Sequence, residues 1–344
     1  MLSLFFLSST SETRTGRLRR LAMWLMLLLA VALYGAFGRQ LFLLSTLGTV
    51  FLYIVLTQAW NILGGYGGYL NFGMVTFFGA GAYASAVFFQ YFELSPFLTA
   101  PVAGLVSAVL AVLIGIPTLR IRGAYFALVT MIITFAVQTL VLDLPVTQGA
   151  LGIYLQPLPL SPLGVERLFY FLFLGCAVAV TVLVYAIEHS NFGWALVAIR
   201  EDEDAAEIVG VRTVEVKWIA NGVAAFIAGV VGGLYAQRIM YIEPTGTFAF
   251  DISLNVVLMA VIGGAGTWQG PLIGVPLVLL VADLLRVTVT SEVNRTIFSV
   301  VVILIALFIP GGVMGVWMRW RRGRRKKPMD AAAMAASAGK EPTR

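Results

Sequence analysis

The chain has 344 residues, of which 60% are hydrophobic and 12% are charged, and its formal net charge is +6. Soluble domains carry about 45–50% apolar and about 25% charged residues, so this composition excludes an ordinary soluble protein and indicates several membrane-spanning segments. One cysteine excludes an intrachain disulfide framework, and one histidine excludes a multi-histidine metal site. The positive charge does not indicate nucleic-acid binding, because the basic residues cluster beside hydrophobic segments.

A basic N-terminal segment precedes the first apolar run. Four arginines lie within residues 1–20, the apolar run covers Leu21–Phe37, and no small-residue cleavage site follows it. We therefore expect residues 1–20 to form a cytoplasmic N-terminal segment, followed by an uncleaved first transmembrane helix.

Apolar stretches follow one another along residues 21–318, which we interpret as a single transmembrane domain. A helix needs about 20 apolar residues to cross a bilayer, and this length sets the expected bounds. The ten predicted crossings are Leu21–Gly38, Leu41–Leu63, Tyr66–Phe89, Phe97–Leu119, Ala124–Leu142, Arg167–Ile187, Val216–Tyr235, Phe250–Gly264, Pro271–Val289 and Ile297–Trp317. The predicted fold is all-α, a polytopic transmembrane helix bundle with about ten crossings.

The distribution of basic residues orients this bundle. With a cytoplasmic N-terminus, the external loops hold only five of the 23 lysines and arginines: Arg39, Arg167, Arg238, Arg286 and Arg295. This bias agrees with the positive-inside rule, and an even number of crossings places both termini in the cytoplasm. The long external segment Asp143–Glu166 carries four prolines. They disfavour helix and predict an extended connector or a landing surface for a delivering protein.

Residues 319–344 form a basic tail. Seven lysines and arginines lie between Arg319 and Lys327, and each such charge near an anionic membrane surface contributes about 1 kcal/mol of attraction. The remaining tail is small and polar, so we predict a disordered cytoplasmic end.

Glycines crowd the boundary between the second and third predicted crossings. Residues 61–83, NILGGYGGYLNFGMVTFFGAGAY, contain seven of them. One interpretation is close helix packing, because Gly64 and Gly68 have the four-residue spacing that lets helices approach. The alternative is a broken helix near the transport path, whose freed backbone groups face a polar cavity. Asn71 needs a hydrogen-bonding partner in either case.

The most polar interior segment is His189–Arg212, HSNFGWALVAIREDEDAAEIVGVR, which lies between two apolar runs. We predict two short helices at the membrane surface, broken at Ala198–Glu201, with acidic residues starting the second helix, where the helix dipole favours negative charge. Its apolar residues are expected to be buried: Trp194, Leu196, Val197, Ile199, Ile208 and Val209. The segment is either a solvated charged loop or a docking element for a soluble partner. Adjacent Ala205 and Ala206 allow close approach and Gly210 allows a sharp exit, which favours docking.

The segment Ile262–Pro271, IGGAGTWQGP, is rich in glycine like a phosphate loop but lacks the Lys-Ser/Thr ending that grips phosphate. We interpret it as a tight cytoplasmic turn between two crossings. The sequence shows no nucleotide site and no converging nucleophile, base or metal ligands. We therefore expect a protein that is not an enzyme and has no metal or cofactor of its own, so that any ATP is hydrolysed by partner subunits.

Five sequence blocks, in this order, resemble the LivM type of permease in branched-chain amino-acid ABC importers. They are GGYGGYLNFGMVTFFGAGAYASA, IPTLRIRGAYFALVT, VTQGALGI, FGWALVAIREDEDAAEIVGV and LMAVIGGAGTWQGPLIG, and a closing IPGGVMG follows. The resemblance covers Thr57–Gly315. Residues 204–206, Asp-Ala-Ala, followed by Gly210, resemble the Glu-Ala-Ala loop of such permeases, with Asp in place of Glu. Residues 71–74, Asn-Phe-Gly-Met, stand where family members commonly have Ser-Leu-Gly-His.

The resemblance implies a permease subunit of an importer in the bacterial inner membrane. A second, related but non-identical permease subunit would complete the pathway within membrane lipid, two cytoplasmic ATPase subunits would drive it, and a periplasmic binding protein would deliver the substrate. Coupling to the ATPases is assigned to Arg200, Glu201, Asp204, Ala205, Ala206, Glu207 and Gly210. Candidates for the translocation pathway are Asn71, Phe72, Thr76 and Asn255.

Two alternatives remain open. The same importer class includes permeases for urea, short-chain amides and other amino acids. A passive channel or an ion-coupled carrier is the other alternative, although a channel does not need the acidic cytoplasmic loop. The absence from the sequence of a chain of buried Asp, Glu and His that could relay protons counts against a carrier.

Overall fold

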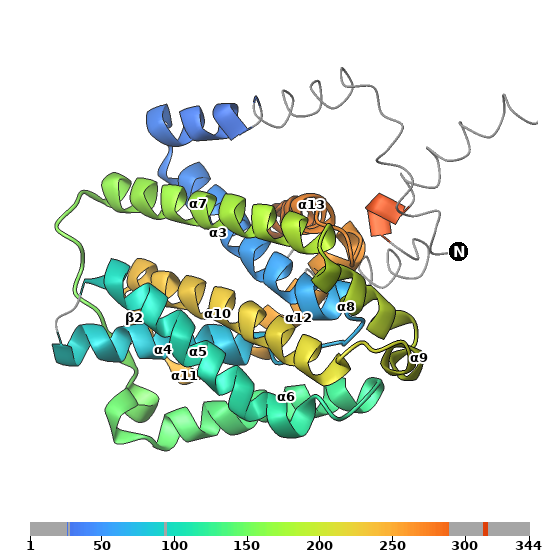
Figure 1. Cartoon of the computed structure of the whole chain (residues 1–344). Helices are drawn as coiled ribbons and strands as arrows, with labels where there is room; N and C mark the ends of the chain where they lie inside the picture. Colours follow the sequence, from blue (N-terminus) through green and yellow to red (C-terminus); the bar gives the residue numbers. More distant parts are fainter. Residues whose placement is uncertain (1–25, 27, 93–94, 289–311, 316–344) are drawn as a thin grey trace, which may run out of the picture.

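The computed structural model describes residues 26, 28–92, 95–288 and 312–315, which form a helical bundle (Figure 1). The long helices are α3 (Leu41–Trp60), α4 (Met74–Phe92), α5 (Pro96–Thr118), α6 (Ala124–Asp143), α7 (Pro162–Glu188), α10 (Thr213–Ile239), α12 (Phe250–Gly263) and α13 (Gly270–Thr288). The shorter elements are the π-helix η1 (Asn61–Tyr66), the 3-10 turns η2 (Pro145–Thr147) and η3 (Gly149–Leu151), helices α8 (Asn191–Glu201), α9 (Glu203–Ile208) and α11 (Pro244–Thr247), and strands β1 (Ile153–Tyr154) and β2 (Tyr241–Ile242). The predicted all-α class is confirmed, apart from the two-residue β ladder.

Six helical stretches in the described part of the chain are long and apolar enough to cross a membrane, so the prediction of ten crossings is not confirmed. They are Leu41–Tyr66, Phe97–Thr118, Ala124–Asp143, Pro162–Glu188, Thr213–Ile239 and Pro244–Gly263. The first predicted crossing is described as the shorter apolar helix Leu28–Phe37, and the ninth contributes Gly270–Asp283. The tenth predicted crossing, apart from residues 312–315, lies outside the described residues, as do the predicted terminal segments 1–20 and 319–344.

Two predicted helix starts are wrong. The third crossing was expected from Tyr66, but residues 67–73 are not helical and α4 begins only at Met74. The backbone turns there with a φ of 75° at Gly68, a conformation that interrupts a right-handed helix. We call η1 together with residues 67–73 the broken segment. The sixth crossing starts earlier than expected, because Pro162 occupies the first helical position, where a proline needs no hydrogen bond.

Helix α10 is the centre of the bundle and packs against α3, α4 and α5 (Figure 1). Its buried face is made mostly of alanine and glycine. Side chains this small let neighbouring backbones come close. A Cβ atom on Gly232 would lie 2.1 Å from the carbonyl oxygen of Phe78, and one on Gly81 of α4 would lie 2.4 Å from the Cα of Gly229. The crossing of α4 and α10 therefore depends on glycine at these positions.

Replacing Gly232 with alanine is expected to destabilise the chain by about 1–3 kcal/mol, because the new methyl group forces the two backbones apart. Gly222→Ala is the matched control on the same helix, since its Cβ would meet no atom within 4 Å. Thermal unfolding in detergent should show a lower melting temperature than wild type for Gly232→Ala and an unchanged melting temperature for Gly222→Ala. Equal melting temperatures would contradict this account of the helix crossing.

The outer faces of α5 and α6 expose apolar side chains. Leu105, Val109 and Leu113 of α5 are each about 60% exposed, as is Ile132 of α6. Rows of exposed leucine, isoleucine and valine on long helices are unfavourable in water and suit contact with lipid tails. The chain is therefore a multi-pass membrane protein.

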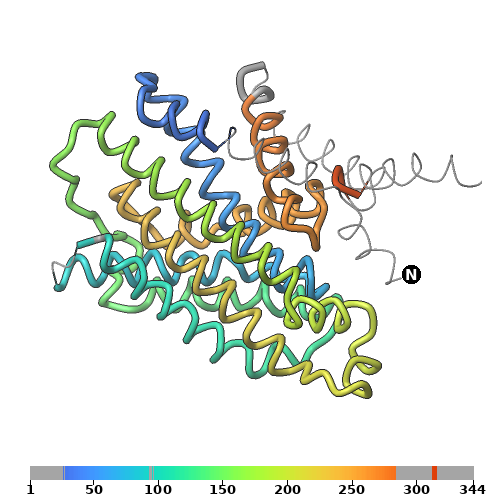
Figure 2. Tube along the Cα trace, turned by 45° about the horizontal axis from the view of Figure 1, so that its top comes forward, coloured from blue at the N-terminus to red at the C-terminus, as the bar shows by residue number. Residues whose placement is uncertain are grey.

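The bundle has two distinct ends. Helices α8 and α9 lie at one end, on the right in Figure 1, and the β1–β2 ladder lies at the other. The ladder is antiparallel and pairs Ile153 with Ile242 and Tyr154 with Tyr241. Figure 2 shows α13, in orange, at the edge of the bundle, where it packs on α12 and α3.

Candidate functional site

The acidic segment His189–Arg212, called the coupling loop below, folds as two short helices, as predicted. The break between them is at Asp202, one residue beyond the predicted range. Asp202 is extended, with φ −161° and ψ 111°, and its side chain accepts a hydrogen bond from the Ala205 N–H at 3.0 Å. It therefore ends α8 and caps α9. Gly210 has a φ of 91°, which agrees with the expected sharp exit after α9.

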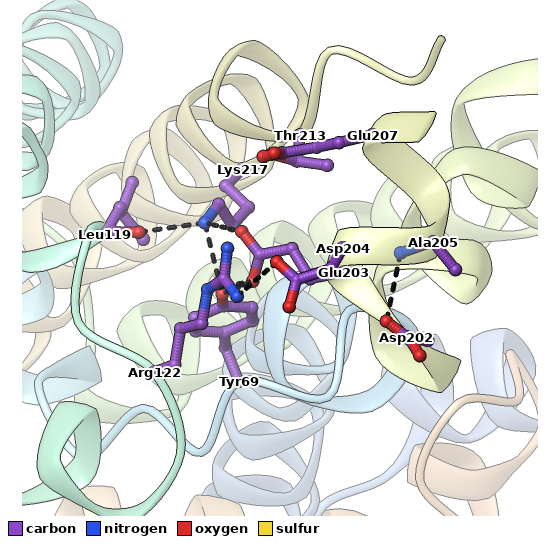
Figure 3. Close-up of polar contacts among 10 residues, drawn as sticks. All are labelled: Tyr69, Leu119, Arg122, Asp202, Glu203, Asp204, Ala205, Glu207, Thr213 and Lys217. Atoms are coloured by element: carbon purple, nitrogen blue, oxygen red, sulfur yellow. Dashed lines mark hydrogen bonds and ion pairs between the residues drawn. The ribbon is translucent and has the colours of Figure 1, made fainter. Parts of the chain in front are cut away.

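A buried lysine anchors the start of α9 to the bundle (Figure 3). The side chain of Lys217, on α10, is 2% exposed, and its Nζ donates to the Leu119 carbonyl at 2.9 Å, the Tyr69 hydroxyl at 3.1 Å and Glu203 Oε1 at 2.6 Å. The other oxygen of Glu203 accepts from the Tyr69 hydroxyl and lies 3.3 Å from Nε of Arg122. One carboxylate thus joins α9 to α10, to the broken segment and to the turn before α6.

The charges of this cluster are arranged to keep Glu203 ionised. Burial by itself raises the pKa of the Glu203 carboxyl, but hydrogen bonds from Lys217 and Tyr69, with the charges of Lys217 and Arg122, lower it below its ordinary value of 4.5. Burial and the Glu203 hydrogen bond raise the pKa of Tyr69, so its hydroxyl remains a donor at neutral pH. The neighbouring Asp204 accepts from Arg122 at 2.7 Å.

Arg200 of α8 reaches from the coupling loop into a gap lined by glycine. Its Nη1 donates to the Gly65 carbonyl at 2.8 Å. A Cβ on Gly68 would lie 2.7 Å from Arg200 Cγ, and one on Gly266 would lie 2.8 Å from Arg200 Nη1. The glycines of the broken segment therefore make room for this side chain. The packing interpretation of Gly64 and Gly68 in a continuous helix is wrong.

The turn between α12 and α13 is fastened to the same end of the bundle. The Gly266 N–H donates to the side-chain oxygen of Asn61 at 2.8 Å. Glu188, at the end of α7, accepts from the Tyr66 hydroxyl at 2.5 Å and from the Trp268 N–H at 3.1 Å. The coupling loop, the broken segment and this turn thus form one connected polar layer.

Three of the four predicted pathway residues lie close together: Asn71 and Phe72 belong to the broken segment, and Thr76 lies in the first turn of α4. Asn71 and Thr76 line a cavity of about 10 Å³, which is room for roughly one water molecule. Phe72 packs on Phe250, with ring centroids 5.6 Å apart. Asn255 is half-buried on α12, outside the lining of this cavity. In this conformation the cavity is too small for an amino acid.

The predicted coupling residues divide into two groups. Ala206 is buried, with 3% of its surface exposed, and Arg200 contacts the broken segment. The other five are exposed: Glu201, Asp204, Ala205, Glu207 and Gly210. Trp194, Ile208 and Val209 were expected to be buried but are 40%, 86% and 78% exposed. Ile208 lies on the outward side of α9, and Val209 follows directly after the helix. The outer side of α9 therefore presents apolar and acidic side chains together.

Sequence reasoning missed the anchor itself. Lys217, Tyr69 and Arg122 were not identified from the sequence as partners of Glu203. One signal was available, because Lys217 is the only charged residue within the apolar segment Val216–Tyr235. A lone charge in such a segment calls for a partner, although the sequence does not say which.

The fold and this site define a multi-pass helical membrane protein with a charge-anchored loop at one end of its bundle. The family described as branched-chain amino acid transport system, permease component, matches residues 42–307. The chain therefore belongs to this family of transport permeases.

Curated relatives agree with that assignment. The high-affinity branched-chain amino acid transport system permease protein LivM of Salmonella typhimurium is 28% identical, over 87% of this chain and 73% of its own length. LivM of Escherichia coli is 29% identical, over 86% of this chain and 72% of its own length. A probable branched-chain amino acid transport permease protein LivH of Methanocaldococcus jannaschii is 24% identical, over 73% of this chain and 85% of its own length. A comparison with solved structures found no match.

Proposed function

We propose that this chain is a transmembrane permease subunit of an ATP-binding-cassette importer that moves branched-chain amino acids across a bacterial inner membrane. Membership of the permease family supports the transport role, and the names of the relatives support the solute. A periplasmic binding protein delivers the amino acid, and two cytoplasmic ATPase subunits supply the energy. Similarity to proteins named LivM and to one named LivH supports a second, related permease subunit.

The observation that carries this proposal is the contrast within α9. Its inner side is held by the Lys217–Glu203 pair at 2.6 Å, while Ile208 and Val209 on its outer side are 86% and 78% exposed. A loop that only contacts solvent does not need α9 to be held rigidly. A surface that transmits a conformational change from another protein does need it. Exposed apolar residues beside acidic ones suit a protein–protein contact of moderate polarity.

Reconstitution tests the proposal. Proteoliposomes that hold the chain, its second permease subunit and the ATPases, supplied with the binding protein, are expected to take up radiolabelled leucine only with hydrolysable ATP. Uptake of urea or acetamide without leucine would favour the amide-importing alternative. Leucine uptake by the permease subunits alone, at the full rate, would favour a channel or carrier and contradict the proposal.

Labelling of single cysteines tests the orientation. In a Cys176→Ala background, Glu207→Cys on the coupling loop should react with a membrane-impermeant maleimide only in inside-out vesicles. Tyr154→Cys, 75% exposed at the opposite end, is the matched control and should react only in right-side-out cells. The reverse pattern would rule out contact between α9 and cytoplasmic ATPases.

A further inference from the structure

A second polar site lies at the end of the bundle opposite the coupling loop. A cavity of about 370 Å³ is formed there by α3, α4, α7, α10 and α12. Arg238 lines it from the last turn of α10, roughly 30 Å along that helix from Lys217. The volume falls in the range of about 300–1,000 Å³ that is usual for pockets that hold small molecules. We call this space the Arg238 cavity.

An ion pair forms the polar side of the cavity. Arg238 Nη2 lies 3.1 Å from Glu166 Oε2 and donates to Ser45 Oγ at 3.0 Å, while Nη1 donates to Thr49 Oγ1 at 3.3 Å. The side chains of Arg238 and Glu166 are 9% and 21% exposed. Leu52, on α3, belongs to the apolar side, with Phe78 and Ile252.

Stability alone does not account for this pair. A buried ion pair is often no more stabilising than apolar residues of the same size, because both charges lose their hydration. Arg238 and Glu166 were predicted in external segments, but they lie in α10 and α7, helices long and apolar enough to cross a membrane. Charged side chains in such helices tend to mark the path of a polar solute. An ion pair beside an apolar wall is complementary to a small molecule that carries two opposite charges and an aliphatic chain.

We propose that the Arg238 cavity binds an α-amino acid with an aliphatic side chain as a zwitterion. The guanidinium of Arg238, with the Ser45 and Thr49 hydroxyls, receives the carboxylate, since Arg–carboxylate pairs form strong charge-assisted hydrogen bonds. Glu166 receives the ammonium group. The aliphatic chain lies on the wall that includes Leu52. A zwitterion leaves neither protein charge unpaired, whereas an anion or a cation leaves one.

This inference rests on the proposed function and names the site within the chain where its solute binds. Urea and short amides carry no charge, so they have no group to exchange with either member of the ion pair. The cavity thus selects between the branched-chain and amide alternatives by charge.

Binding of labelled L-leucine to the complex of permease and ATPase subunits in lipid nanodiscs, without the binding protein, tests the site. Arg238→Gln and Glu166→Gln are each expected to weaken leucine binding by about tenfold or more. L-leucinamide, which lacks the carboxylate, and 4-methylpentanoate, which lacks the ammonium group, should bind the wild-type protein at least about tenfold more weakly than leucine. Arg167→Gln is the matched control, because Arg167 is the next residue to Glu166 but donates to the Gly38 carbonyl at 3.1 Å.

A second variant leaves the ion pair intact. Ile252→Trp fills part of the apolar side, so it should weaken leucine binding about tenfold while alanine binding changes less than about twofold. If either charge variant fails to fold, the Ile252→Trp result tests the site alone. Leucine binding that is not weakened relative to alanine binding would overturn the proposal.

The outcomes separate the two proposals. Folded variants that bind and import leucine like the wild type would overturn the Arg238 cavity and leave the proposed function standing. Equal binding of leucine and leucinamide would also overturn it. A wild-type importer that moves no branched-chain amino acid would overturn the proposed function, and the site with it.

Discussion

Ala205→Arg should reduce ATP-driven uptake at least about tenfold, while the chain still folds and inserts into the membrane. Ala205 is exposed in the first turns of α9, beside Asp204 and close to Ile208. An arginine there adds bulk and charge where a partner surface must come close, so the contact loses its fit without any change in the bundle. Uptake in proteoliposomes, and co-purification of the ATPase subunits, measure the two parts of this expectation.

Ala206 would be a poor choice for the same test. It is 3% exposed, so Ala206→Arg buries a charge inside the chain and is expected to destabilise α9 itself. Arg212→Ala is the control for Ala205→Arg, because Arg212 is 79% exposed and its salt bridge among the described residues is to the nearby Glu215 at 3.4 Å. Ala205→Arg with normal uptake and normal ATPase co-purification would show that α9 does not couple the chain to its partners.

Lys217→Met is expected to have the largest effect on folding. It removes the cation and leaves Glu203, 10% exposed, without its closest charged partner. Breaking a buried ion pair on one side typically costs about 3–5 kcal/mol, because the remaining charge is desolvated. Arg122 stays 3.3 Å from Glu203 and keeps part of the pairing, so we expect a loss near the lower end of this range. Thermal unfolding should report the loss, and hydrogen exchange should show that α9 opens more often than in the wild type.

A double variant separates stability from coupling. Lys217→Met with Glu203→Met removes both charges, so much of the lost stability should return. Uptake should stay low, because α9 is no longer held against α10 and the broken segment. Wild-type melting and unchanged exchange in α9 for Lys217→Met alone would mean that the ion pair does not hold the loop.

The sequence predicted most long helices well where the apolar run is continuous. Helix α5 was expected at Phe97–Leu119 and is found at Pro96–Thr118, and α6 was expected to begin at Ala124, as it does. In such runs the length needed to cross a bilayer and the flanking polar residues set the ends. The two short helices of the coupling loop were also expected, but their break was placed at Ala198–Glu201 and lies at Asp202, the N-cap of α9.

The broken segment and the anchor could not be placed from local pattern. Arg200 and Gly65 are 135 residues apart in the sequence, and Lys217 and Tyr69 are 148 apart. Whether the glycines of the broken segment continue a helix or interrupt it depends on those distant partners, which neither composition nor spacing identifies. The exposure of Ile208 likewise depends on which side of α9 the anchor holds inward.

The placement of Arg200 has a mechanical consequence. Its guanidinium joins α8 to the Gly65 carbonyl at 2.8 Å, beside the Gly266 turn and just where α3 gives way to π-helix and then to irregular backbone. A displacement of α8 therefore reaches the ends of α3 and α12 together. Wide π turns and glycines bend more easily than a regular helix, so a displacement of α8 would be taken up first at these residues. A movement of the coupling loop would therefore bend the chain at a point where no regular α-helix has to unwind.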